Sequence, residues 1–135
     1  MNWRFLNMYT PTQTQSLRAY ENVSNATQSG RETEAAVLTK AAVKLKDCQD
    51  NWDAPDRDSR LVEALKYNQR IWSIFQSELS REDHALPKKL RLDILRLAAF
   101  IDRRIFETMA FPSPEKLKIV IDINNNLAAG LRSSP

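Results

Sequence analysis

The sequence contains few of the residues on which most catalytic and metal sites depend. Among its 135 residues are one histidine, His84, one cysteine, Cys48, and two glycines, Gly30 and Gly130. A structural zinc site needs several Cys or His ligands, and a phosphate-binding loop needs closely spaced glycines, so the composition excludes both. We therefore expect no metal, no other cofactor and no enzymatic activity.

Long apolar runs are also missing. No stretch approaches the roughly 20 apolar residues that a membrane-spanning helix needs, and the N-terminal segment MNWRFLNMYTPTQTQ has no apolar run that suits a signal peptide. A single cysteine cannot form an intramolecular disulfide, which suits a reducing compartment. These absences predict a cytoplasmic protein that does not insert into a membrane.

The totals of charge and apolar residues indicate one ordinary globular domain. The chain has 20 Lys and Arg against 17 Asp and Glu, a net charge of +3, and 42% of its residues are hydrophobic. This apolar content suffices for a single core at this length. The charge balance neither requires nor excludes nucleic acid as a partner.

The prolines and glycines lie between segments whose apolar residues recur at helical spacing. This pattern predicts an all-α fold, a compact single-domain bundle of about five helices. The expected helices cover residues 17–23, 29–48, 58–80, 87–109 and 114–130. A capping-box sequence from Ser29 to Glu32 marks the start of the second, and Gly130 marks the end of the fifth as a left-handed stop. We assign residues 1–15 to a flexible N-terminal extension and 16–135 to the helical domain.

Two of these segments carry an asparagine within an apolar stripe, in the same register. The stripes are Leu61-Leu65-Asn68-Trp72 and Leu117-Ile121-Asn124-Ala128. An unpaired amide in a core costs about 1–3 kcal/mol, so each must find a partner inside the fold or on another molecule. We predict that Asn68 and Asn124 face the interior and cap or bridge neighbouring helices. Trp72 is expected in the core, where its indole N–H could meet one of the amides.

The segment 87–109 has more apolar residues than contact with one helix requires. Its main stripe is Leu90, Ile94, Leu97, Ile101, Ile105 and Met109, and a second apolar edge consists of Leu92, Leu95, Ala99 and Phe106. Such a wide apolar arc predicts either the central helix of the bundle or a helix that contacts another protein. The second edge is therefore a candidate partner-binding surface. Asp122, off the main stripe of its helix, is a candidate for an exposed contact or a salt bridge.

The same segment also carries clustered basic residues. Lys88, Arg96 and Arg103 are the candidates for contacting RNA, and acidic residues share their side of the helix. Exposed aromatic residues for stacking single-stranded bases are few. We interpret the cluster as a solvated charged face in preference to a direct nucleic-acid site.

Four short segments, in order and spacing, resemble a known family. They are Gly30-Arg31-Glu32-Thr33-Glu34, Ala64-Leu65 with Asn68 and Ile71-Trp72, Ala85-Leu86-Pro87 with Leu90-Arg91, and Ile121-Asp122-Ile123-Asn124 with Gly130-Leu131. Together they resemble the FlaF family of small bacterial flagellar biosynthesis regulators over most of the chain. Departures are Gly30 where proline is usual, Phe100 where tryptophan is common and Asn125 where arginine is common. Of the matching residues, we interpret Arg31, Glu32, Asn68, Trp72 and Asn124 as structural.

The resemblance implies a flagellar biosynthesis regulator that binds unassembled flagellin and supports its synthesis or secretion in the manner of a chaperone. Its expected partners are flagellin and a FlbT-like regulator. The alternative is an RNA-linked post-transcriptional regulator of flagellin expression that acts with FlbT, and a third possibility is a subunit that only scaffolds another regulator. A helical body with surplus apolar surface could cover an amphipathic helix of flagellin in a groove.

Overall fold

The computed structural model describes the backbone of residues 17–133 and the side chains of residues 30–133. Its helices are α2 (Leu17–Asp50), α3 (Arg57–Leu79), α4 (Lys88–Ala110) and α5 (Lys118–Ser133), and a 3₁₀ turn η2 (Pro114–Leu117) precedes α5. No strand occurs among these residues. The predicted all-α, single-domain bundle is confirmed, with four helices in place of about five. The extension assigned to residues 1–15 lies outside the described residues.

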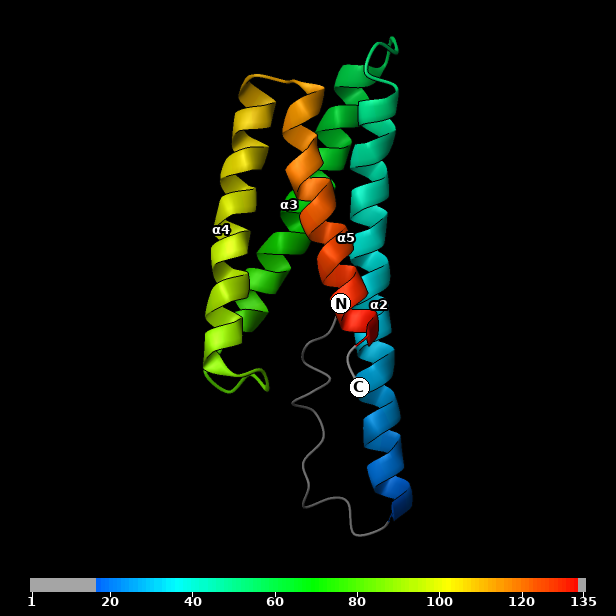
Figure 1. Ribbon diagram of the computed structural model, residues 1–135, viewed down its shortest axis with the longest axis vertical. Coiled ribbons are helices and arrows are strands. Elements are labelled where there is room, and N and C mark those ends of the chain that lie inside the picture. The colour runs from blue at the N-terminus through cyan, green and yellow to red at the C-terminus, as the bar shows by residue number, and fades with distance from the viewer. Residues whose placement is uncertain (1–16, 134–135) are drawn as a thin grey trace.

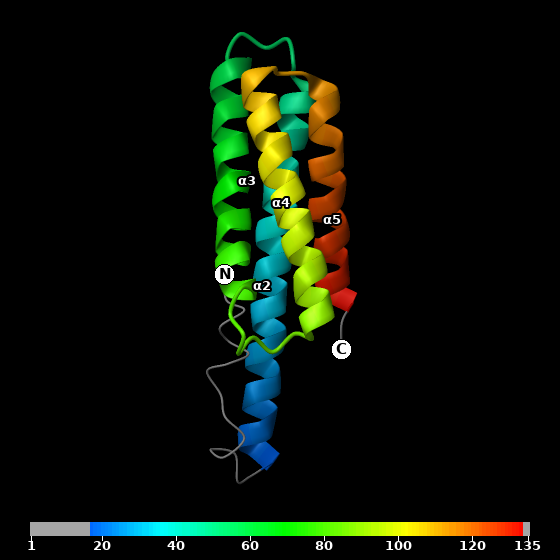
Figure 2. The ribbon, with the colours of Figure 1, turned by 90° about the vertical axis from the view of Figure 1, so that its left-hand side faces the viewer.

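Helix α2 is the central element of the bundle. Both α3 and α5 pack on α2, whereas α4 packs mainly on α3 and touches η2 (Figure 1). In the view onto the α4 side, α4 lies in front of α2 with α3 and α5 on its two flanks (Figure 2). The prediction that segment 87–109 could be the central helix is therefore wrong, and its outer face is left free of the other helices described.

The two helices predicted before residue 50 are one continuous helix, so the predicted start at Ser29 is wrong. Residues 17–50 remain helical through Gly30, which is buried. A glycine costs only about 1 kcal/mol within a helix, and unlike proline it keeps the backbone N–H that the helical hydrogen bond uses. The departure from proline at position 30 thus permits the long helix, whose N-terminal part projects beyond the other three (Figure 1).

The predicted left-handed stop at Gly130 is also wrong. Helix α5 continues to Ser133, and no described glycine has a positive φ. Leu131, after the glycine, is buried at the edge of the core, so packing favours another helical turn. The start of this helix is close to the prediction, although Pro114 opens a 3₁₀ turn and Ser113 forms no side-chain cap.

Changing Gly130→Ala is expected to stabilise the protein by about 0.5–1 kcal/mol. The backbone there is helical, and a Cβ at this position would have nothing within 4 Å. Alanine therefore restricts the unfolded chain without straining the folded one. Urea unfolding followed by circular dichroism measures the change, and an unchanged or lower midpoint would contradict it.

A layer of large apolar side chains fills the space between the helices. Trp72 and Phe75 of α3 are fully buried, with their rings edge to face and centroids 5.4 Å apart. The rest of the buried core comes from all four helices and η2, including Leu38, Leu45, Leu65, Leu79, Ile101, Ile105, Leu117 and Val120. Aromatic pairs of this geometry add about 0.5–1.5 kcal/mol to their burial.

The two asparagines face the interior and bridge neighbouring helices, as predicted, and they also bind each other. The Asn124 Nδ2 group donates to Asn68 Oδ1 at 2.7 Å, and the Trp72 indole Nε1 donates to Asn124 Oδ1 at 2.9 Å. Asn68 Nδ2 in turn donates to the carbonyl oxygens of Ala64 at 2.9 Å and Ala41 at 3.2 Å. Both asparagines are fully buried. This relay joins α5, α3 and α2 and accounts for the repeated register of asparagine in the two stripes.

Surface contacts fix the outer edges of the helices. Arg132 of α5 donates to Glu32 Oε1 at 3.3 Å and to Thr39 Oγ1 at 3.1 Å on α2, which gives the family-motif residue Glu32 a structural contact. Arg31 of the same motif is half-buried on α2. In the acidic connection after α2, Asp56 forms no side-chain cap and instead binds Arg60 at 2.8 Å. Asp56 therefore takes part in an exposed ion pair and does not cap helix α3.

Candidate functional site

The outer face of α4 carries an apolar strip, which we call the α4 stripe: Leu92, Leu95, Ala99 and Phe106. Their spacing of three, four and seven residues puts them on one side of the helix. Phe106 is 75% exposed and Leu92 42% exposed, while Leu95 is partly buried against the core. Of the four residues, only Leu95 therefore packs against other helices of the chain. Such packing was one of the two roles predicted for this apolar edge.

The side of α4 that faces the bundle differs from the predicted main stripe. Its buried residues are Ile94, Ala98, Ile101, Ile105 and Thr108. The predicted core residues Leu90, Leu97 and Met109 are instead substantially exposed. Ala98 and Thr108 are buried in their place, and the Thr108 hydroxyl donates a hydrogen bond to the Arg104 carbonyl oxygen at 2.6 Å. The core side is thus narrower and less hydrophobic than the sequence indicated.

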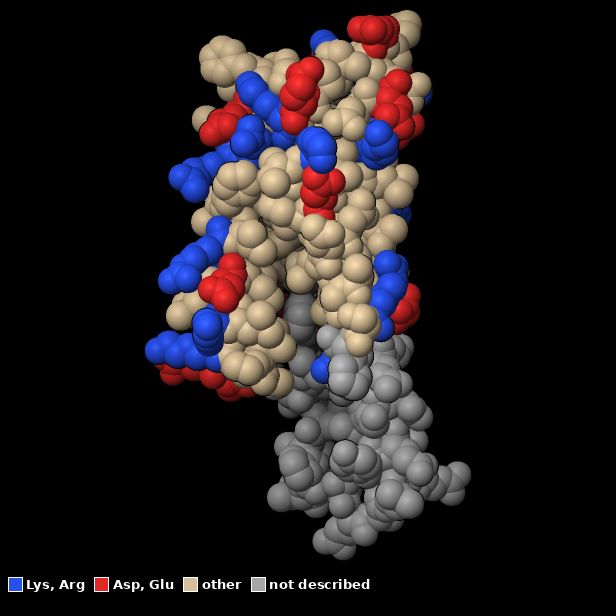
Figure 3. Space-filling view, viewed as in Figure 1, with Lys and Arg blue, Asp and Glu red and all other residues tan. Residues whose placement is uncertain are grey.

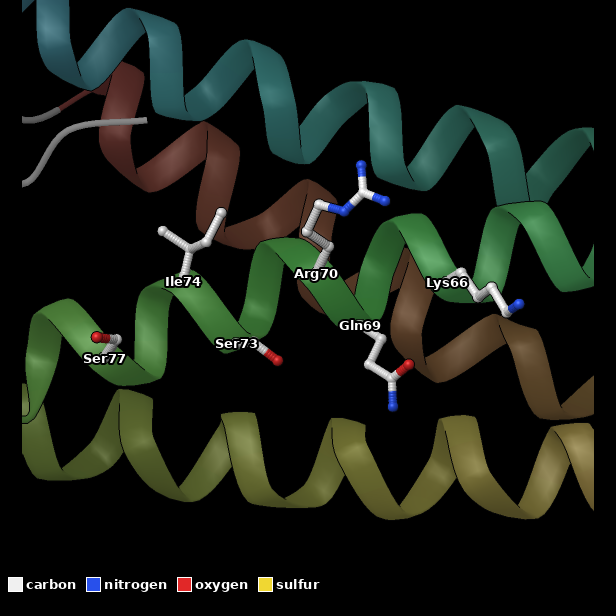
Figure 4. Close-up of a pocket in the computed structure, with 6 residues that line it drawn as sticks. All are labelled: Lys66, Gln69, Arg70, Ser73, Ile74 and Ser77. Carbon is white, nitrogen blue, oxygen red and sulfur yellow. The ribbon is translucent and has the colours of Figure 1, made fainter.

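One side of α3, which we call the α3 wall and which comprises Gln69, Ser73 and Gln76, borders the α4 stripe. Gln76 of α3 donates to the Asp102 carboxylate of α4 at 3.3 Å, which fixes the two helices side by side. The exposed side of α3 also has an open hollow of about 550 Å³, lined by Lys66, Gln69, Arg70, Ser73, Ile74 and Ser77. In Figure 4, Gln69 and Ser73 extend toward the side on which α4 runs. Sequence reasoning missed this wall, although Ser73 and Ser77 lie one turn apart off the apolar stripe of their helix.

Basic residues line the edge of the molecule over α4 (Figure 3). The candidates Lys88, Arg96 and Arg103 are all exposed. Arg96 lies 3.3 Å from Asp93, and Arg104 lies 3.9 Å from Glu107. Within the described part of the chain, Lys88, Lys89 and Arg103 form no ion pair. The structure thus brings the proposed RNA contacts onto the helix that carries the α4 stripe.

Asp122 is not part of this surface. It lies on α5, where Lys118 Nζ donates to its carboxylate at 2.7 Å in an i, i+4 pair. Of the two predictions for Asp122, an exposed contact or a salt bridge, the structure therefore shows the salt bridge. The pair is exposed, so it contributes little to stability.

The residues that could support catalysis are buried or isolated. His84 lies in the loop between α3 and α4, and its Nδ1 accepts a hydrogen bond from the Leu86 backbone N–H at 3.1 Å. Burial and the nearby Arg91 cation lower the pKa of His84, and burial raises the pKa of the Cys48 thiol. Among residues 30–133, whose side chains are described, no group of three His, Cys, Asp or Glu side chains could hold a metal ion. Within residues 17–133, no helix has the length and apolarity to span a membrane.

The fold and this surface define a small all-helical bundle whose edge helix presents apolar and basic residues to the outside. A family model described as Flagellar protein FlaF matches residues 16–131. The chain therefore belongs to the FlaF family and is a flagellar protein. Searches of curated proteins and of solved structures gave no match.

Proposed function

We propose that this FlaF protein binds unassembled flagellin in the cytoplasm through the α4 stripe and thereby supports flagellin synthesis or secretion, as a chaperone-like regulator without catalytic activity. The observation that carries the proposal is the exposure of large apolar side chains along α4, above all Phe106. Apolar patches rimmed by polar residues are typical of protein interaction sites.

The mode of binding follows from the shape of the surface. A partner helix that lies along α4 would cover the α4 stripe and contact the α3 wall around Ser73. Subunits of filaments commonly bury apolar helix faces only on assembly, so a protein that covers them beforehand prevents aggregation. The buried relay through Asn68, Trp72 and Asn124 holds α3 in place beneath this surface.

Calorimetric titration of monomeric flagellin tests the proposal directly. We expect the wild-type protein to bind with a dissociation constant on the order of 10 µM or tighter. Changing Phe106→Asp is expected to weaken binding at least about tenfold, because it places a charge in the contact that must be desolvated. The matched control is Phe111→Asp, since Phe111 is also 75% exposed but lies beyond the end of α4. Absence of wild-type binding, or equal losses in the two variants, would contradict the proposal, provided that circular dichroism shows both variants folded.

A second candidate function is the RNA-linked one, in which the protein regulates flagellin expression together with a FlbT-like partner. The observation that favours it is that Lys88, Lys89 and Arg103 lack acidic partners in the described part of the chain. Counterion release makes RNA affinity fall steeply with salt, whereas apolar helix docking varies little. A gel shift with flagellin mRNA that disappears between low and moderate salt would support this alternative.

A further inference from the structure

A basic row runs along one flank of the α4 stripe. Lys89, Arg96 and Arg103 recur every seven residues, as do the stripe residues Leu92, Ala99 and Phe106. Seven residues are about two helical turns, or roughly 10.5 Å, so the two rows run side by side along the outer face. Figure 3 shows Lys and Arg side chains spread along this edge of the molecule over α4.

The side chains of this basic row are exposed, and the row lies on one flank of the α4 stripe. Lys89 and Arg103 form no ion pair within residues 30–133, and the Arg96 contact with Asp93 at 3.3 Å joins two exposed side chains. Exposed pairs of this kind contribute little, so Arg96 can exchange Asp93 for another carboxylate. On the opposite flank of the α4 stripe lie Ser73 and Gln76 of α3 and the Asp102 carboxylate of α4, which accepts a hydrogen bond from Gln76 at 3.3 Å.

We propose that the α4 surface selects an amphipathic partner helix with carboxylates along one edge of its apolar stripe. The apolar residues would pack on Leu92, Ala99 and Phe106, while the carboxylates would meet Lys89, Arg96 and Arg103. Since the basic row lies on one flank only and the Asp102 carboxylate lies on the other, the pairing also sets which way the partner helix is turned about its axis. The inference rests on the proposed function in that it takes the α4 stripe as the partner surface.

Three other occupants of the α4 surface are disfavoured: a second copy of the chain, residues 1–16 and RNA. A two-fold axis across the α4 stripe would place the basic row against its own copy, which disfavours a dimer through this face. Residues 1–16 contain no Asp or Glu, so they offer no partner for the row. RNA is disfavoured because its phosphates would engage the basic row but leave the exposed apolar side chains of Leu92 and Phe106 uncovered.

Two synthetic peptides test the inference with the intact protein. Both form an amphipathic helix with the same leucine and alanine stripe, and one has glutamate and the other lysine along one edge. We expect the acidic peptide to bind at least tenfold more tightly in a fluorescence anisotropy titration. The variant with Lys89→Glu, Arg96→Glu and Arg103→Glu should prefer the lysine peptide. The matched control with Lys40→Glu, Lys46→Glu and Lys118→Glu has the same net charge and should behave as wild type.

The outcomes separate the inference from the proposed function. Equal affinity for the two peptides, or a preference that the charge reversal does not change, would overturn the inference. Tighter binding of a polyuridine RNA through the same row would also overturn it, as would a wild-type dimer in sedimentation that Phe106→Asp dissociates. If flagellin binds the wild-type and charge-reversed proteins equally, the inference fails and the proposed function stands. If flagellin does not bind but the peptide preference inverts, the proposed function fails and the inference stands.

Discussion

Changing Trp72→Ala is expected to lower the free energy of unfolding by about 3–5 kcal/mol. Trp72 is fully buried between α3 and its neighbours and packs edge to face on Phe75. Its removal leaves a large cavity and deprives Asn124 Oδ1 of its donor. A domain of this size is stabilised by only about 5–15 kcal/mol, so the variant is expected to be marginally folded.

Denaturant unfolding monitored by circular dichroism measures this loss. The control is Trp52→Ala, because Trp52 is only partly buried, in the connection between α2 and α3, where the Arg57 guanidinium stacks 4.4 Å from its ring centroid. We expect the control to cost about 1 kcal/mol, the magnitude of a partly exposed packing and cation–π contact. Similar losses in the two variants would show that the centre of the core is not at Trp72.

Changing Asn124→Ala is expected to cost about 2–6 kcal/mol although it removes only a small polar group. The Trp72 indole N–H and the Asn68 Oδ1 atom would both remain buried without their partner. Each unsatisfied group costs about 1–3 kcal/mol, which is the source of the estimate. Asn126→Ala, at an exposed position of the same helix, is the control and should change stability by less than about 0.5 kcal/mol.

A double-mutant cycle distinguishes the hydrogen-bonded relay from simple packing. The combination of Asn124→Ala with Trp72→Phe removes donor and acceptor together, so it should cost less than the sum of the single changes by about 1 kcal/mol. Additive losses in thermal and urea unfolding would mean that the indole and the amide act independently. That result would contradict a structural role for the repeated asparagine.

The buried relay could be predicted in outline from the sequence. An asparagine in the same place of two apolar stripes implied an interior position for each, and the nearby Trp72 supplied a donor. The sequence did not predict that Asn68 and Asn124 bind each other. That contact requires the two helices to be aligned along their axes, and the alignment of α3 and α5 depends on the packing of the whole bundle. The carbonyl oxygens of Ala41 and Ala64, which complete the relay, carry no sequence signal since every residue has one.

At two predicted helix ends, tertiary packing overrides the local sequence signal of a glycine. Gly30 and Gly130 both have sequence surroundings typical of helix ends, yet both lie within helices. A glycine opposes a helix by only about 1 kcal/mol, which the burial of a neighbour such as Leu131 can offset. Proline acts through a missing N–H and a steric clash, and the boundaries near Pro55, Pro87 and Pro114 were accordingly predicted well.

The candidate surface on α4 could be found, but not delimited, from the sequence. Both apolar rows of this helix have helical spacing, so periodicity cannot tell which one faces the bundle. The structure places Ala98 and Thr108 inside, and leaves Leu90 and Leu97 substantially exposed. The side of α4 that is buried depends on how α4 packs on α3 and η2, and the periodicity of one helix does not contain that information.

Photo-crosslinking tests most directly whether the outer face of α4 is the partner surface. A photoreactive amino acid is placed at Ala99, in the middle of the α4 stripe, or at Ala129, an equally small exposed residue of α5. With flagellin monomer present, the account predicts a crosslinked complex from position 99 and little or none from position 129. Crosslinking from position 129 with none from position 99 would contradict it.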